Sequence, residues 1–187
     1  GEQIISHALC WNEQKYECWY VDKSSYLQGR KIRYVSSLDG KTWMPNKICL
    51  LDGPMIDPWH IDVQYYNGKY QMIVYDMQML LWYDSDDGLH FRYISKILSP
   101  SNNKYDFYMD GLYRACSIKT EKKILVYFSA RRQNRTYIGV LSTSDRVHFS
   151  KINGLTTLKW LSIVWSPLLK AYLNRIIKLI KKIIKIK

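Results

Sequence analysis

A short turn motif recurs three times along the chain, and this repetition limits the folds that the sequence can adopt. The copies are Ser37–Trp43, Ser85–Phe91 and Thr143–Phe149, which share the pattern hydroxyl-x-Asp-Gly-x-x-aromatic, with Arg146 replacing the third glycine. The aspartate can accept backbone N–H bonds, the glycine can adopt a positive φ at no steric cost, and the aromatic residue is expected to pack between strands. Because Arg146 carries a side chain, we expect the third turn to be looser or of a different type.

Runs of apolar and aromatic residues around each turn are typical of β-strands. The predicted strands are 7–11, 16–21, 31–35, 60–64, 70–75, 79–83, 92–95, 114–118, 124–128 and 137–141. Four antiparallel strands in a repeat of about 50 residues are typical of a propeller blade. The sequence therefore predicts an all-β fold of three four-stranded blades, at about 4–50, 56–100 and 110–154. Propellers have about four to eight blades, so we expect the missing blades in a longer parent protein or an oligomer, or else an open fragment.

The first predicted strand of each repeat begins with a polar residue at an equivalent position. These residues are His7, His60 and Arg114, and Asp62 follows His60 on the same face of its strand. We expect a polar axis that reaches solvent. Alternatively, Asp62 is a structural carboxylate, the two histidines form ordinary hydrogen bonds, and Arg114 binds a carboxylate of the protein or of a substrate.

Two segments carry a resemblance to known proteins. The stretch from Trp59 to Tyr70, with the Ser-x-Asp-Gly-x-x-Trp turn, resembles five-bladed β-propeller glycoside hydrolases, the superfamily of glycoside hydrolase family 43 and the invertase-like enzymes. The segment Leu112–Arg114 resembles an inner-strand motif of uncharacterised proteins near bacterial polysaccharide loci. The resemblance covers about residues 5–150 and implies three blades of five.

The resemblance also implies roles for individual residues. Asp62 stands where the family keeps an inner-strand aspartate that tunes the catalytic acid, and Asp110 stands where the family often has its general acid. Cleavage of a glycosidic bond normally needs two carboxylates, and we expect the base on a blade N-terminal to this sequence. The expected substrate-binding residues are His7, Trp59, His60, Tyr113 and Arg114. The alternative for most tryptophans, Trp19 and Trp43 especially, is packing between blades.

The positive charge of the chain is concentrated at its C-terminal end. The net charge is +12, but eight of the 28 basic residues lie between Lys159 and Lys187, where there is no acidic residue. The remaining 20 basic and 16 acidic residues do not favour nucleic acid as a partner. Residues 155–167 read as a linker, and 168–187 predict a cationic amphipathic helix that lies on a membrane surface or packs on the propeller.

The cysteine spacing matches no zinc motif, and we expect neither a metal nor another cofactor. Four buried thiols are expected, with a Cys10–Cys18 disulfide as the alternative in an exported protein. We see no signal peptide, so the expected location is cytoplasmic or peripheral to a membrane. Because the sequence lacks an initiator methionine, we expect a chain that was cut, processed or taken from a longer product.

These features lead to a carbohydrate-active domain, in which the parent protein hydrolyses glycosidic bonds of a poly- or oligosaccharide. The alternative is a non-catalytic sugar-binding or scaffold propeller linked to surface-polysaccharide metabolism. A third hypothesis is a cationic membrane-associated peptide fused to a degenerate body.

Overall fold

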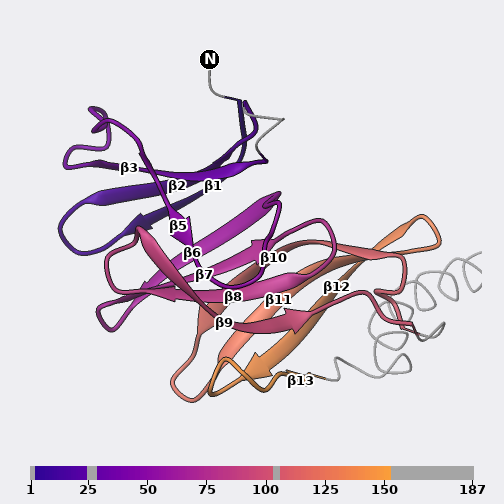
Figure 1. The fold of residues 1–187 in the computed structure, drawn as a ribbon. Coiled ribbons are helices and arrows are strands. Elements are labelled where there is room, and N and C mark those ends of the chain that lie inside the picture. Colours follow the sequence, from indigo (N-terminus) through magenta and orange to yellow (C-terminus); the bar gives the residue numbers. More distant parts are fainter. Residues whose placement is uncertain (1–2, 25–28, 103–105, 153–187) are drawn as a thin grey trace, which may run out of the picture. The chain divides into compact units, whose positions relative to one another are not determined.

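The computed structural model describes residues 3–24, 29–102 and 106–152, which form strands joined by turns and loops (Figure 1). These residues contain no helix, and therefore none that could cross a membrane. The predicted helix at 168–187 and the linker before it lie outside the described residues. Within them the all-β prediction is confirmed.

The strands form three sheets that follow one another along the chain. The first sheet contains β1 (Ile4–Trp11), β2 (Tyr16–Asp22), β3 (Lys31–Ser37) and β4 (Lys47–Ile48). The second contains β5 (Leu50–Leu51), β6 (His60–Tyr66), β7 (Lys69–Tyr75), β8 (Leu80–Ser85) and β9 (His90–Leu98). The third contains β10 (Gly111–Lys119), β11 (Ile124–Arg132), β12 (Arg135–Thr143) and β13 (Ser150–Lys151).

Each sheet is built mainly from consecutive antiparallel strands, as the repeat predicts. Every predicted strand falls on a strand of the structure, although β8 begins at Leu80 rather than at Met79. The strand β5 was not predicted; it pairs in parallel with β9 and so joins the second sheet. The strands β1, β6 and β10 of the three sheets lie together, with β6 next to both β1 and β10 (Figure 1).

The second sheet is buried on both faces because its strands alternate between two hydrophobic cores. Met72 and Val74 belong to the core shared with the first sheet, and Ile73 to the core shared with the third. The outer sheets differ, because Leu9 on β1 and Ile138 on β12 remain 60% and 76% exposed. Each outer sheet therefore carries a large apolar side chain that no described residue covers.

The three motif turns have the same geometry. In each one the aspartate Oδ1 accepts two backbone N–H groups at 2.8–2.9 Å, and the hydroxyl accepts the N–H of the fourth residue at 2.7–2.9 Å. The φ angles of Gly40, Gly88 and Arg146 are 70°, 74° and 65°. The expectation that Arg146 loosens the third turn is therefore wrong. Its guanidinium pairs with Asp84 and its carbonyl accepts the Ser95 hydroxyl at 2.6 Å, which helps to offset the left-handed backbone.

The aromatic residue of each turn packs against the preceding sheet where such a sheet is described. Phe91 is buried against the first sheet and Phe149 contacts Trp82 of the second. Trp43 is 38% exposed, so its predicted packing between sheets is wrong for the described residues, because none of them forms a sheet on that side. Packing of Trp19 is confirmed, since it is fully buried and its indole N–H donates to the Gly88 carbonyl at 2.7 Å.

All four cysteines are free, but they do not share one environment. Only Cys49 is buried, whereas Cys10 and Cys18 are half-buried and Cys116 is exposed. The expectation of four buried thiols is thus right for one of them. Across the β1–β2 hairpin, Cys10 faces Glu17 and Cys18 faces Leu9, so the two cysteines are not paired opposite each other.

Candidate functional site

His60, the first residue of β6, is surrounded by aromatic side chains. Its ring centroid is 4.5 Å from that of Tyr113, 6.1 Å from Trp59 and 6.3 Å from Tyr75. His60 is 5% exposed, and neither ring nitrogen has a hydrogen-bond partner among the described residues. A buried polar group without a partner is costly, so a hydrogen-bond partner for either nitrogen of this imidazole would be stabilising. We call these four residues the His60 cluster.

The charge state of His60 follows from its surroundings. Burial, together with the nearby Arg114 guanidinium, lowers the pKa of His60 to about 4. The ring is therefore neutral near pH 7 and carries one N–H donor and one acceptor nitrogen. Such a group can both donate to and accept from a sugar hydroxyl.

Local backbone geometry places Tyr113 and Arg114 beside this ring. The pairing of β10 with β11 shifts register between Leu112 and Ala115, which is the signature of a bulge. Bulges redirect side chains near the ends of strands. Both residues are exposed, and the Arg114 guanidinium lies 5.9 Å from the Tyr113 ring centroid. The sequence analysis expected both as substrate-binding residues, and the structure brings them together with His60 and Trp59.

Trp59 also meets a cation from the residue that precedes β3. The Arg30 guanidinium lies 4.3 Å from the Trp59 ring centroid and pairs with the carboxylate of Asp57. One face of this indole is therefore occupied by Arg30, and a sugar would have to stack on the other face or displace the arginine. Tyr75 was not predicted as part of the site, because its alternating pattern on β7 is that of a core residue.

Asp62 connects β6 to β10. Its Oδ2 accepts the Ser117 N–H at 3.0 Å and the Ser117 hydroxyl at 3.5 Å, and its Oδ1 accepts the Gln64 amide at 3.3 Å. Burial raises the pKa of Asp62, and these hydrogen bonds oppose the rise. The carboxyl group therefore keeps its proton to a higher pH than an exposed aspartate does. Its hydrogen bonds to Ser117 also connect β6 to β10.

Two thiols stand near this carboxylate. Burial raises the pKa of both Cys10 and Cys116, and the charge of Asp62 adds to each rise. Side chains of β1, β6 and β10 thus converge around Asp62. The position of these two thiols near Asp62 was not predicted, because the spacing of the cysteines along the chain carries no motif.

Two other predicted residues, His7 and Asp110, have different surroundings. His7 is exposed on β1, next to Ser6 and Ala8, which point to the opposite face. Asp110 accepts the Gln133 N–H and donates its own N–H to the Arg131 carbonyl at 3.1 Å. Its contacts therefore hold the β11–β12 turn. Within the described ranges, no group of three His, Cys, Asp or Glu side chains is close enough to hold a metal ion.

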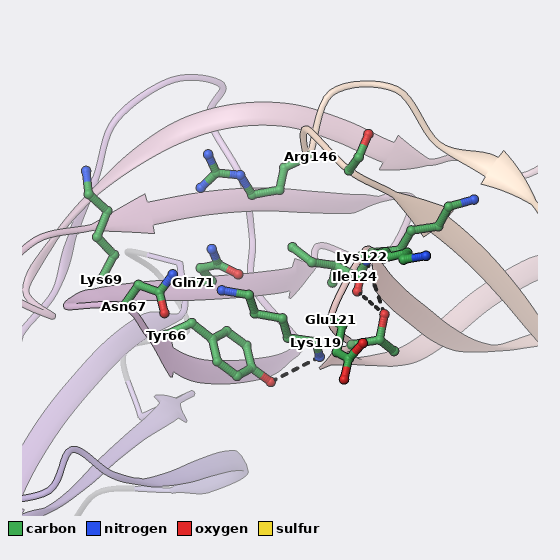
Figure 2. A pocket seen from close by; sticks show the side chains of 12 residues that line it. Tyr66, Asn67, Lys69, Gln71, Lys119, Glu121, Lys122, Ile124 and Arg146 are labelled. Atoms are coloured by element: carbon green, nitrogen blue, oxygen red, sulfur yellow. Dashed lines mark hydrogen bonds between the residues drawn. The ribbon is translucent and has the colours of Figure 1, made fainter.

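A second feature lies at the other ends of β6 and β10, away from His60. A pocket of about 360 Å³ opens between the β6–β7 and β10–β11 hairpins and is rich in lysine (Figure 2). Sequence reasoning did not single out these residues, because the lysines are spread over two hairpins that come together only in the fold.

Comparison with known proteins supports the fold. No protein-family model and no curated protein sequence matches the chain. Among solved structures, it is similar to a family 117 glycoside hydrolase from the marine bacterium Zobellia galactanivorans, with a TM-score of 0.66 and 15% identity over 82% of this chain and 56% of that chain. It is also similar to the α-L-arabinofuranosidase Arb93A from Fusarium graminearum, with a TM-score of 0.65 and 15% identity over 80% and 47% of the two chains.

A third similar structure is an N-acetylgalactosamine deacetylase from F. plautii, in complex with blood group B trisaccharide. Its TM-score is 0.62 and its identity is 18%, over 74% of this chain and 49% of that chain. The chain thus spans about half the length of these three structures. At such identities the likeness concerns the fold, and that fold is the one found in propeller glycoside hydrolases.

Proposed function

We propose that this chain is part of a carbohydrate-binding propeller whose complete form hydrolyses glycosidic bonds, and that the His60 cluster contacts the sugar. The observation that carries the proposal is the buried, neutral imidazole of His60, which has no partner among the described residues and lies between Trp59 and Tyr113. Aromatic rings with a few polar groups are typical of small-ligand sites. The similar folds of carbohydrate-active proteins support the same substrate class.

The proposed parent is a five-bladed ring, of which 4–50, 56–100 and 110–154 supply three blades. Support comes from the exposed apolar side chains of the outer sheets, such as Leu9 and Ile138, and from the exposed Trp43. The counterparts of Trp43, Phe91 and Phe149, pack on a preceding sheet. In that ring Asp62 tunes the catalytic acid, Asp110 is the candidate acid and the base lies on another blade. Arg114 and His7 are further proposed substrate contacts.

Calorimetric titration of the full chain with arabino-oligosaccharides and blood group B trisaccharide tests the sugar site. His60→Phe keeps an aromatic ring of similar size but removes both nitrogens, so binding should weaken about tenfold or more. The exposed His148, which pairs with Asp145, provides the matched control His148→Gln. Unchanged binding by His60→Phe, with a native circular dichroism spectrum, would overturn the role of His60.

The second candidate function is a non-catalytic sugar-binding scaffold. It is favoured by the contacts of Asp62 and Asp110, since each accepts a backbone N–H as a structural carboxylate would. Activity assays on the full-length parent separate the two functions. Hydrolysis that disappears in Asp62→Asn supports the enzyme, whereas sugar binding without any turnover supports the scaffold.

Contact with an anionic membrane surface through 168–187 is a separate proposal that rests on the sequence pattern alone. Co-sedimentation with anionic vesicles should be lost when these residues are deleted. Equal sedimentation of the full and shortened chains would remove the membrane from the proposal.

A further inference from the structure

The lysine-rich pocket is formed by segments of two sheets. Its lining residues are Tyr66, Asn67, Lys69, Gln71, Lys119, Thr120, Glu121, Lys122, Lys123, Ile124, Ser144 and Arg146. His60 begins β6 and Tyr66 ends it, so the pocket and the His60 cluster lie at opposite ends of that strand. We call it the cationic pocket. Its volume of about 360 Å³ falls in the range of small-ligand sites.

The charges of this pocket are not balanced. Five lining side chains are basic and one, Glu121, is acidic. Lys69 pairs with Asp86 at 3.1 Å and Arg146 pairs with Asp84. The other three, Lys119, Lys122 and Lys123, form no ion pair with any residue that the structure describes. Unpaired ammonium groups around one cavity favour an anionic ligand.

Gln71 adds a second, independent indication of a ligand. It is 9% exposed, it lines the pocket, and its Oε1 has no hydrogen-bond partner within the described part of the chain. In Figure 2 the Lys119 side chain extends over the Tyr66 ring toward Gln71, and its ammonium lies 5.5 Å from that ring's centroid. A ligand hydroxyl could satisfy the buried oxygen.

We propose that the cationic pocket binds an acidic saccharide, a sugar that bears a carboxylate or a sulfate ester. Sulfate would meet the lysines but has no hydroxyl for the Gln71 oxygen, whereas a neutral sugar would leave the lysines unpaired. An acidic sugar supplies both groups, and Tyr66 provides an aromatic ring at the wall of the pocket. This site goes beyond the proposed function, because it lies away from the His60 cluster and needs no residue of it.

Calorimetric titration of the full chain tests the proposal with three probes: a glucuronic acid disaccharide, the neutral glucose disaccharide of the same linkage, and inorganic sulfate. We expect the acidic disaccharide to bind about tenfold or more tightly than either of the others. Its affinity should fall as sodium chloride is raised, because salt screens exposed charges. Equal affinity for the neutral disaccharide, or sulfate binding as tight as that of the acidic one, would overturn the proposal.

Two variants and a control locate the binding. Lys119→Ala and Gln71→Leu should each weaken the acidic disaccharide several-fold, whereas Lys96→Ala, which removes an exposed lysine on β9, should not. Thermal melting checks that each variant is folded. Binding unchanged in both Lys119→Ala and Gln71→Leu would contradict the assignment.

The same titrations separate this proposal from the function proposed for the His60 cluster. His60→Phe should leave the acidic disaccharide unaffected, and Lys119→Ala should leave neutral arabino-oligosaccharides unaffected. Loss of acidic-disaccharide binding in His60→Phe would place that ligand at the other end of β6 and overturn the separate site.

Discussion

The two ends of β6 present opposite environments for a polar group that lacks a partner. At one end His60 lies among aromatic rings, where burial holds it neutral. At the other end the Gln71 oxygen lies in a pocket lined by five basic side chains. Both side chains are buried at the edge of a core, but one environment disfavours charge and the other attracts negative charge. The comparison suggests that one two-sheet junction can serve two kinds of ligand.

The largest effect expected from this contrast is the pH dependence of stability at His60. The pKa of His60 is about 4 in the folded protein and about 6.5 in an unfolded chain. Folding therefore keeps His60 unprotonated between these values, and the stability it contributes is complete above pH 6.5. As pH falls from about 6.5 to about 4, up to about 3 kcal/mol of that stability is lost.

Urea unfolding of the wild type and His60→Phe at pH 7 and pH 4.5 measures this difference. Because phenylalanine does not titrate, the wild type should lose stability relative to the variant on acidification. All other titratable groups are common to both proteins, so their contributions cancel when the two free energies of unfolding are subtracted. Parallel stability profiles would mean that His60 is solvated or paired in the folded protein, and the contrast between the two ends would fail.

Charge reversal in the cationic pocket should have the next largest effect. Lys119→Glu combined with Lys123→Glu places two carboxylates where unpaired ammonium groups stood, so an acidic disaccharide should bind about 100-fold more weakly. Neutral oligosaccharides should be unaffected, because the His60 cluster is at the other end of β6. Calorimetric titration of the double variant with the acidic disaccharide and with a neutral oligosaccharide measures both affinities. A parallel loss of both would indicate one shared site.

The parts of the fold that were predicted from the sequence are local ones. The motif turns, the strands and the order of antiparallel neighbours follow from short patterns, such as the Ser85–Phe91 turn. Predictions were wrong where the environment of a residue depends on which sheets pack against each other. Trp43 has the same pattern as Phe91 but is exposed, and Arg146 keeps a positive φ because Asp84 and Ser95 of another sheet bind it.

The candidate site divides in the same way. His60 and Arg114 were predicted because the strands of successive repeats place them at equivalent positions. Trp59 and Tyr113 were predicted from the resemblance of their segments to known proteins and from the affinity of aromatic rings for sugars. Tyr75 and the lining of the cationic pocket were missed, since neither a core-like tyrosine nor scattered lysines signal a site before the sheets are assembled. Asp110 was predicted as an acid from its sequence position, whereas in the structure its carboxylate accepts the Gln133 N–H of a hairpin turn.

Asp62 offers a smaller effect at the centre of β6. Burial raises its pKa, so the folded protein binds this proton more tightly than the unfolded chain does. The contribution of Asp62 to stability therefore falls as pH rises through the carboxyl range, from about 3.9 upward. Asp62→Asn should gain stability relative to the wild type between pH 4 and pH 7, but less than the His60 effect, because hydrogen bonds from Ser117 and Gln64 favour the carboxylate.

Denaturant unfolding at several pH values checks this difference. Glu121→Gln is a suitable control, because Glu121 is exposed and has no hydrogen bond or ion pair to a described residue. A wild type that gains stability relative to Asp62→Asn as pH rises would mean that the hydrogen bonds outweigh burial. That result would also weaken the proposal that Asp62 tunes an acid, since its pKa would then be lowered.

The smallest effect, at Gln71, sharpens the comparison most. If the amide oxygen of Gln71 has no partner in the absence of ligand, Gln71→Leu removes a costly buried acceptor. The leucine places an apolar side chain of similar size against the core. The free energy of unfolding should then stay within about 0.5 kcal/mol of the wild type or rise by up to about 1 kcal/mol, while binding of the acidic disaccharide weakens. A structural glutamine gives the reverse result, with stability falling by about 1 kcal/mol or more and binding unchanged. A ligand-binding role therefore predicts weaker binding at nearly unchanged stability, and a structural role predicts lower stability at unchanged binding. Urea unfolding and calorimetry on this one variant decide between them.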